Sequence, residues 1–300
     1  MSAGAREVPR IVLFGHGIVG QEALAVLIGM GYEVTAVFAH APTPGDWQVG
    51  LAEEARRYAI PCFVDAKFDA PETVAIVAAA APDLIVSAYC RELLPAALLA
   101  CARLGGVNLH GSPLPHYRGR APVNWMVLRG EVQGGVSLHQ MTARADRGPL
   151  LGVTRFPIGV EDTAFDVLLN VRREGGNLLR HCLPGFLTGT LTPTAQGKGS
   201  MFGRRTPADG RIDWSWSASR IHCLVRALTR PYPGAFADLG EERVVIWWAT
   251  LRAEIVLEPG VSLPRGRSML VGTGTHALAL LDYQVTGAAS GNPTATPAIR

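Results

Sequence analysis

Short apolar runs alternate with amphipathic stretches through the first part of the chain. Strands separated by single helices form βαβ units, in which the strands are parallel and helices cover both faces of the sheet. The pattern therefore predicts an α/β fold with a Rossmann-like, doubly wound parallel sheet. Runs typical of buried strands fall at residues 11–14, 33–39, 60–64, 84–88 and 106–109, and helical spacing of apolar positions falls between them at 21–30, 48–59, 71–81 and 92–102.

The pattern changes near residue 185, where glycine and proline become frequent. Further along, one helical stretch at 217–229 precedes apolar runs at 243–248, 253–256, 268–271 and 277–283. Short strands at regular spacing favour a small, OB-like β-barrel. We therefore expect a catalytic domain at 1–190, a linker at 191–204, a β-rich domain at 205–286 and a frayed tail at 287–300.

The composition is that of a folded, water-soluble protein. The chain has 300 residues, 48% hydrophobic and 18% charged, which is enough to bury a sizeable core. No apolar run reaches the roughly 18–20 residues of a membrane span, and residues 1–10 lack the apolar segment of a secretory signal. The net charge of +3 gives no strong nucleic-acid footprint. The five cysteines form no CxxC pair and the histidines are scattered, so we expect a cytoplasmic protein without disulfides or a metal site.

A glycine-rich turn follows the first predicted strand. Gly15, Gly17 and Gly20 match the GxGxxG pattern of dinucleotide-binding proteins. Such proteins also need an acidic residue at the end of the second strand, but that strand ends near His40 and has Glu33 at its start. An NAD(P)-dependent oxidoreductase is therefore a weaker alternative. A turn at a helix N-terminus can still face a ligand, which makes Gly15, His16 and Gly17 candidate substrate contacts.

The end of the fifth predicted strand carries side chains suited to catalysis. Asn108 and His110 stand at i and i+2, so both side chains emerge on one face. In an open α/β sheet, ligands bind at the carboxyl ends of the strands. An asparagine amide can donate to a developing oxyanion, and a histidine can carry a proton near neutral pH. Asp146, which follows a predicted strand at 135–141, can hold that histidine and raise its pKa.

The spacing of these residues resembles the formyltransferase family that uses 10-formyltetrahydrofolate. The hallmark of that family is Asn-x-His-x-Ser-x-x-Pro-x-x-Arg-Gly-x-x-Pro, followed further along by Met-x-x-x-x-Asp-x-Gly. One departure is Pro113, where the family usually has leucine. The matching residues in this chain are Asn108, His110, Ser112, Pro115, Arg118, Gly119, Pro122, Met141, Asp146 and Gly148.

The resemblance implies a catalytic triad of Asn108, His110 and Asp146, with 10-formyltetrahydrofolate as co-substrate and no metal. His139 is predicted to be structural, and Trp125 to pack rather than to stack on a nucleotide. Weaker candidates for contacts with the substrate are Ser112, Arg118, Arg204 and Arg205. The residues implied to border the folate are Glu92, Leu93, Leu94, Arg120, Thr142, Ala143, Arg144 and Ala145.

Within the family, the chain is most similar to the branch that formylates UDP-4-amino-4-deoxy-L-arabinose in lipid A modification. Residues 202–207, 209–214, 225–227 and 231–236 carry this similarity. It implies a nucleotide-linked amino sugar as substrate. It leaves open whether a second copy of the chain, or a separate dehydrogenase-decarboxylase, is a partner.

The main alternative is methionyl-tRNA formyltransferase, in which a long basic loop after the second strand binds the acceptor stem of the tRNA. The corresponding residues 39–50 contain no lysine or arginine. Phosphate contacts dominate affinity for nucleic acids, so this sequence favours a small substrate over tRNA. A catalytically inactive binding module is a further alternative, and the presence of all three triad residues argues against it.

Overall fold

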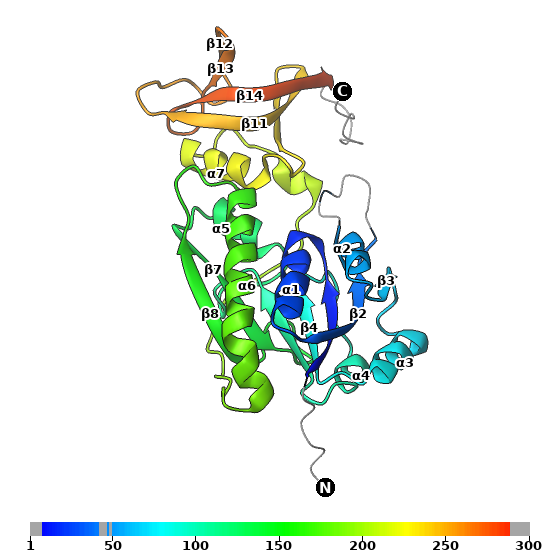
Figure 1. Ribbon diagram of the computed structural model, residues 1–300. Coiled ribbons are helices and arrows are strands. Elements are labelled where there is room, and N and C mark those ends of the chain that lie inside the picture. The colour runs from blue at the N-terminus through cyan, green and yellow to red at the C-terminus, as the bar shows by residue number, and fades with distance from the viewer. Residues whose placement is uncertain (1–7, 42–46, 48–49, 289–300) are drawn as a thin grey trace. The chain divides into compact units, whose positions relative to one another are not determined.

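The computed structural model describes residues 8–41, 47 and 50–288 (Figure 1). Most of the predicted tail at 287–300 and much of the loop at 39–50 therefore lie outside the described residues. The chain divides into two compact units. The sheet unit comprises Met1–Gly119, Gly135–Phe156 and Leu169–Met201, and the β-rich unit comprises Arg120–Gly134, Pro157–Leu168 and Phe202–Arg300.

The sheet unit is built on a seven-stranded sheet with the strand order β3-β2-β1-β4-β5-β7-β8. The first five strands along the chain pair in parallel, which confirms the predicted doubly wound core. The strand β7 instead runs antiparallel to β5, because the chain returns from the same edge of the sheet at which β5 ends. The strands are β1 (Arg10–Gly15), β2 (Glu33–Ala39), β3 (Cys62–Val64), β4 (Leu84–Ala88), β5 (Gly106–His110), β7 (Gln133–Gln140) and β8 (Leu150–Pro157).

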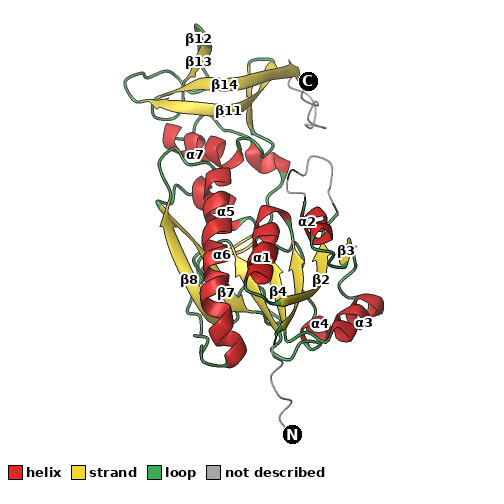
Figure 2. Cartoon of the chain, viewed as in Figure 1, coloured by secondary structure: helices red, strands yellow, loops and turns green. Residues whose placement is uncertain are grey.

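Helices cover both faces of this sheet. On one face, Phe14 of β1 and Phe38 of β2 stack with ring centroids 4.5 Å apart, and they share a buried cluster with Val77 and Leu98. Val77 belongs to α3 (Pro71–Ala80) and Leu98 to α4 (Ala96–Leu99). On the other face lie α1 (Gly17–Gly29) and α6 (Ala164–Thr188), which Figure 2 shows in front of the strands. Gly175 of α6 lies so close to β5 that a Cβ there would be 2.7 Å from Leu109.

Two helices depart most from the prediction. Helix α4 begins only after Pro95, because the residue before a proline is disfavoured in the helical region. The 25-residue helix α6 has no counterpart among the predicted elements. It continues through Pro184 and Gly185, where the change in composition indicated a linker, and ends at Thr188, just before Gly189, whose φ is +77°. The sheet unit also contains α2 (Leu51–Arg57) and the two-residue strand β6 (Arg118–Gly119).

The β-rich unit is a five-stranded antiparallel sheet with the order β10-β11-β14-β13-β12. No pairing among its described residues closes β12 onto β10, so the predicted β-rich domain is present as an open sheet. The predicted strand at 253–256 is wrong, because β11 runs on to Arg252 and a turn follows. The elements are α5 (Pro122–Leu128), β9 (Met201–Phe202), the 3-10 helix η1 (Pro207–Gly210), α7 (Ala218–Leu228), β10 (Ala235–Leu239), β11 (Glu242–Arg252), β12 (Ser262–Arg265), β13 (Ser268–Val271) and β14 (Ala277–Ala288).

Candidate active site

The carboxyl ends of the parallel strands lie at one edge of the sheet, and the predicted catalytic residues gather there. Asn108 and His110 are on β5, whose antiparallel pairing with β7 places His139 directly opposite Asn108. The loop between β7 and β8 brings Asp146 to the same point. The strand order, together with this one loop, thus brings together residues that are far apart in the sequence.

The four side chains form one connected polar cluster. Asp146 Oδ1 lies 3.6 Å from His110 Nδ1 and 3.5 Å from His139 Nε2. His139 Nε2 is also 3.2 Å from Asn108 Nδ2. The other oxygen of the carboxylate, Asp146 Oδ2, accepts a hydrogen bond of 2.8 Å from the Gly119 N–H. The structure therefore brings together the three residues of the predicted triad and adds His139 between two of them.

The tautomer of His110 follows from its hydrogen bond to the backbone. Its Nε2 is 2.9 Å from the carbonyl oxygen of Tyr117, which can only accept, so Nε2 carries the hydrogen. A neutral ring therefore has its lone pair on Nδ1, the nitrogen that faces Asp146. His110 can accept a proton at Nδ1 and hold it beside a carboxylate.

The net shift of the His110 pKa is opposite to the predicted rise. The side chain is almost completely buried, and this burial lowers the pKa below its ordinary value. The Asp146 charge and the Tyr117 carbonyl raise the pKa, as expected, but they do not offset the loss of solvation. His139 lowers it further. The imidazole is therefore neutral at pH 7 and available as a base.

Asp146 is held in its ionised form. Burial raises the pKa of this carboxyl group, but the hydrogen bond from His139, the charge of His110 and the Gly119 N–H together lower it to about 2. Its side chain is 11% exposed, so these interactions are only weakly screened by solvent. The negative charge opposite His110 Nδ1 is present throughout the physiological pH range.

This depressed pKa predicts a pH-dependent stability. A folded-state pKa of about 2, against an ordinary value of 3.8, means that the unfolded chain takes up this proton first as the pH falls. The stabilisation is present above about pH 4 and is lost between about pH 4 and pH 2. We expect the free energy of unfolding to fall by about 2 kcal/mol more in the wild type than in Asp146→Asn between pH 5 and pH 2. Urea titrations at each pH measure this difference, and equal pH dependence in the two proteins would contradict it.

His139 contributes to the cluster, although the sequence predicted a structural residue. Its ring is buried, and its Nδ1–H donates to the Gln140 carbonyl oxygen over 2.7 Å. In the neutral ring, Nε2 is therefore left as an acceptor for one N–H of Asn108, whereas only the doubly protonated ring can donate from Nε2 to the Asp146 carboxylate. No motif marks this histidine. Only the register of β5 against β7 places it opposite Asn108, and an alternating strand pattern does not reveal that register.

Two of the predicted substrate contacts have internal partners instead. Ser112 is fully buried and its hydroxyl donates to the His116 carbonyl oxygen over 2.8 Å. Arg118 is also buried, and its guanidinium donates to the Asp146 carbonyl and to Gln196. Both side chains shape the loop between β5 and α5 rather than face solvent. Their predicted contact with substrate has no support in this geometry.

The glycine-rich turn after β1 has a packing explanation. A Cβ on Gly15 would lie 3.0 Å from the Leu51 side chain, and one on Gly20 3.1 Å from it. Gly17 has a φ of +57°, which glycine adopts without strain. His16 is buried and accepts a 2.7 Å hydrogen bond at Nε2 from Arg91. The turn lies at the same sheet edge as His110, and close packing accounts for its glycines without a dinucleotide.

The residues predicted to border the folate fall into two groups. Leu94 is buried in the core cluster with Leu98, so its side chain is not available to a ligand and any contact with the folate would involve its backbone. The others lie at least partly exposed. They are Glu92 and Leu93 after β4, Arg120, and the turn of Thr142, Ala143, Arg144 and Ala145 that leads into Asp146.

Arg204 and Arg205 lie in the β-rich unit. Arg204 is exposed, and Arg205 stacks on the Trp125 ring at 4.8 Å from its centroid. The Trp125 ring packs against Phe202 at 5.1 Å. Trp125 therefore packs between Phe202 and Arg205. Arg205 also donates to the Asp209 carbonyl oxygen over 2.9 Å, and burial lowers the pKa of its guanidinium while the charge of Asp209 raises it.

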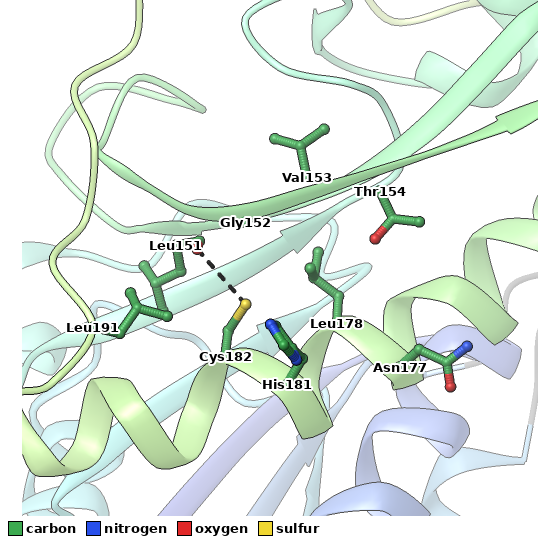
Figure 3. A pocket seen from close by; sticks show the side chains of 9 residues that line it. All are labelled: Leu151, Gly152, Val153, Thr154, Asn177, Leu178, His181, Cys182 and Leu191. Carbon is green, nitrogen blue, oxygen red and sulfur yellow. Dashed lines mark hydrogen bonds between the residues drawn. The ribbon is translucent and has the colours of Figure 1, made fainter.

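A cavity of about 530 Å³ lies between β8 and α6 (Figure 3). Figure 3 shows Thr154 of the strand pointing toward Leu178 on the helix, whereas Val153 points away from it. A Cβ on Gly152 would lie 2.8 Å from the Cys182 sulfur, so this glycine also faces the helix. The Cys182 thiol donates to the Leu151 carbonyl over 3.6 Å. None of the predicted site residues lines this cavity, so it is separate from the cluster around Asp146.

The described residues offer neither a metal-binding cluster nor a membrane-spanning helix. They contain no group of three or more histidine, cysteine, aspartate or glutamate side chains placed to hold a metal ion. None of their helices is both long and apolar enough to span a membrane.

The sequence matches two family models. Residues 11–183 match the model described as formyl transferase. Residues 204–294 match the model described as formyl transferase, C-terminal domain. The first match alone covers more than half of the chain and includes the whole cluster around Asp146.

Solved structures share this fold at low sequence identity. HypX from Aquifex aeolicus in complex with tetrahydrofolic acid matches with a TM-score of 0.67 and 20% identity, over 91% of this chain and 43% of that one. This chain thus spans less than half the length of the HypX structures. An N-formyltransferase from Helicobacter canadensis, in complex with folinic acid and dTDP-3-aminofucose, matches at 0.70 and 19%, over 93% and 98%. Methionyl-tRNA formyltransferase from Clostridium thermocellum matches at 0.58 and 15%, over 93% and 100%.

Proposed function

The chain belongs to the formyl transferase family, and we propose that it moves a formyl group from 10-formyltetrahydrofolate to the amine of a nucleotide-linked amino sugar. The observation that carries the proposal is the cluster of Asn108, His110 and Asp146 at the sheet edge. It combines a hydrogen-bond donor, a neutral base and a fixed negative charge. These are the groups that acyl transfer to an amine requires.

Each residue has one role in the proposed reaction. The substrate nitrogen attacks the formyl carbon, and the carbonyl electron pair moves onto the oxygen. One Asn108 N–H is engaged with His139, so the second is available to stabilise that oxyanion. His110 Nδ1 takes the proton that the amine loses, and Asp146 stabilises the resulting imidazolium. The bond from carbon to N10 then breaks, and His110 returns the proton to N10, which leaves a formamide and tetrahydrofolate.

The exposed turn at 142–145 is the proposed border of the folate. It leads directly into Asp146, and its backbone is tied by the Thr142 hydroxyl, which donates to the Arg144 carbonyl over 3.0 Å. Arg120 follows Gly119, whose N–H binds the Asp146 carboxylate. Both segments are therefore linked to the catalytic carboxylate by the chain itself. Two of the solved neighbours are complexes with tetrahydrofolic acid and folinic acid, which supports a folate in this family fold.

The acceptor we propose is UDP-4-amino-4-deoxy-L-arabinose. The Helicobacter neighbour is a complex with a nucleotide sugar, and its TM-score is higher than that of the methionyl-tRNA enzyme. The loop at 39–50, mostly outside the described residues, contains no lysine or arginine in the sequence. Arg204 and Arg205 are proposed to contact the diphosphate. Arg204 forms no ion pair within the described residues and Arg205 lies near Asp209, whereas Arg211 and Arg230 pair directly with carboxylates.

A competition assay tests the acceptor. Purified protein receives 10-formyltetrahydrofolate with equal concentrations of UDP-4-amino-4-deoxy-L-arabinose and initiator methionyl-tRNA, at moderate salt where non-specific phosphate contacts are weak. We expect formyl transfer to the sugar, because nothing in residues 39–50 supplies the basic contacts that tRNA needs. Efficient formylation of the tRNA would overturn the sugar assignment. Turnover only of a dTDP- or GDP-linked amino sugar would correct the nucleotide.

A further inference from the structure

The segment at 194–200 is bound along the catalytic loops, although its composition predicted a linker. Thr194 exchanges two backbone hydrogen bonds with Leu150, of 2.7 and 2.8 Å. Ser200 accepts at its carbonyl from the Arg118 N–H over 3.1 Å, and at its hydroxyl from the Tyr117 N–H over 3.0 Å. A Cβ on Gly199 would lie 1.9 Å from the Pro115 carbonyl oxygen, so only glycine allows this close approach. We call residues 194–200 the strap.

Gln196, in the middle of the strap, uses its whole hydrogen-bonding capacity. Its Nε2 donates to the carbonyl oxygens of Asp146 and Gly148, over 3.0 and 2.7 Å. Its Oε1 accepts from Nε and Nη2 of Arg118, over 3.2 and 2.8 Å. A side-chain amide has two donor hydrogens and two acceptor lone pairs, and all four are engaged here. A carboxylate of the same size could keep the bonds from Arg118 but could not donate to the two carbonyl oxygens.

These bonds hold the turn that presents the catalytic carboxylate. Asp146 has a φ of +52°, in the left-handed region that is sparsely populated for residues other than glycine. Two residues later, a Cβ on Gly148 would lie 1.9 Å from the Gln140 carbonyl oxygen. Arg118 also donates from Nε to the Asp146 carbonyl over 3.1 Å. The backbone of the turn is thus held by Gln196 and Arg118, while the carboxylate faces His110 and His139.

We propose that Gln196 is a positioning residue for the reaction: it holds the backbone of Asp146 and Gly148 so that the Asp146 carboxylate stays opposite His110 Nδ1. This inference rests on the proposed function for its kinetic consequence. It concerns only the sheet unit and is independent of which amine is formylated. It also gives the strap a role in the active site.

Two variants distinguish the bonds that Gln196 accepts from Arg118 from those that it donates to the carbonyl oxygens. Gln196→Met fills a similar volume and removes all four, whereas Gln196→Glu keeps the acceptors for Arg118 and removes the donors to the carbonyl oxygens. We expect both to lower kcat by between about tenfold and a hundredfold, because a displacement near 1 Å at a reacting group costs up to that much. The KM values for folate and acceptor should change little. Thr194→Val is the matched control, because it removes a side-chain bond of the same strap that does not reach Asp146.

The pKa of His110, measured by NMR on the free protein, is the readout that loss of stability would not move. The charged and titratable groups that face this ring are Asp146, whose charge raises the pKa, and His139, which lowers it. If the carboxylate drifts away in Gln196→Met, the His110 pKa falls further below its wild-type value. This measurement needs no substrate, so it stands even if the amino-sugar assignment fails.

The outcomes are distinct. A lower kcat in both variants, together with a lower His110 pKa in Gln196→Met, supports the proposal. Wild-type kcat in Gln196→Glu, or an unchanged His110 pKa in Gln196→Met, would overturn it, because the two carbonyl bonds would then be dispensable. Failure of both variants to fold, seen by circular dichroism, would also overturn it and assign Gln196 to stability alone.

Discussion

His110→Ala is expected to lower kcat by at least about a hundredfold, the lower end of the range for general acid–base catalysis. The substitution removes the one nitrogen in the cluster that can take the amine proton, because His139 Nε2 already accepts from Asn108. It also leaves the buried Asp146 carboxylate without the charge partner that forms during the reaction. Steady-state kinetics with folate donor and amino sugar measure the loss.

The pH profile gives the same experiment a second readout. Since the pKa of His110 lies below 6.5, the acidic limb of kcat/KM in the wild type should fall below pH 6.5. That limb should disappear in His110→Ala. His116→Ala is the matched control, because His116 lies in the same loop with an exposed side chain. Wild-type turnover by His110→Ala would remove this histidine from the mechanism.

Asn108→Ala is expected to raise the barrier by about 3–4 kcal/mol, which corresponds to a loss of about 10²–10³ in kcat. Asn108 is the only side chain of the cluster that has an N–H without a hydrogen-bond acceptor among the described residues. The oxyanion exists only in the tetrahedral intermediate, so losing this donor should lower kcat and leave KM nearly unchanged.

A second substitution distinguishes the loss of the Asn108 hydrogen-bond donor from the loss of side-chain packing. Asn108→Asp keeps the shape of the side chain and replaces the donor with a negative charge, so it should be at least as slow as Asn108→Ala. Asn177→Ala on α6, at the separate cavity of Figure 3, should leave kcat unchanged. A rise in KM at constant kcat in Asn108→Ala would contradict the oxyanion role and indicate a ground-state contact.

The parts of the fold that depend on local periodicity could be predicted from the sequence. The bounds of β2 and β4 agree with the predicted runs, because a strand buried on both faces is a continuous apolar segment between turns. Helix α6 could not be predicted in this way, because its pattern is interrupted by Gly175, Gly176 and Pro184. Those glycines are explained only by the neighbours they contact, such as Leu109 beneath Gly175.

The candidate site divides in the same way. Asn108 and His110 could be found because they are polar residues at alternate positions of one strand end, and Asp146 because its spacing from them matches a family motif. His139 and Gln196 have no such signal. Their roles arise from the antiparallel register of β7 and from the path of the strap beneath the Asp146 turn. Likewise, the burial that lowers the pKa of His110 results from tertiary packing around its ring, which the sequence pattern does not show.

Periodicity and residue spacing, which are local along the chain, were enough to give the class of the fold and the edge of the sheet where chemistry is expected. The three side chains of the predicted triad came from the resemblance to a family motif. Three further features depend on contacts in space. The first is which nitrogen of His110 acts as the base. The second is the position of His139 between Asn108 and Asp146, and the third is the set of hydrogen bonds from Gln196 that holds the backbone of Asp146. Hydrogen bonds, desolvation and charge act over a few ångströms, and the residues concerned are up to 78 positions apart in the chain, as Arg118 and Gln196 are.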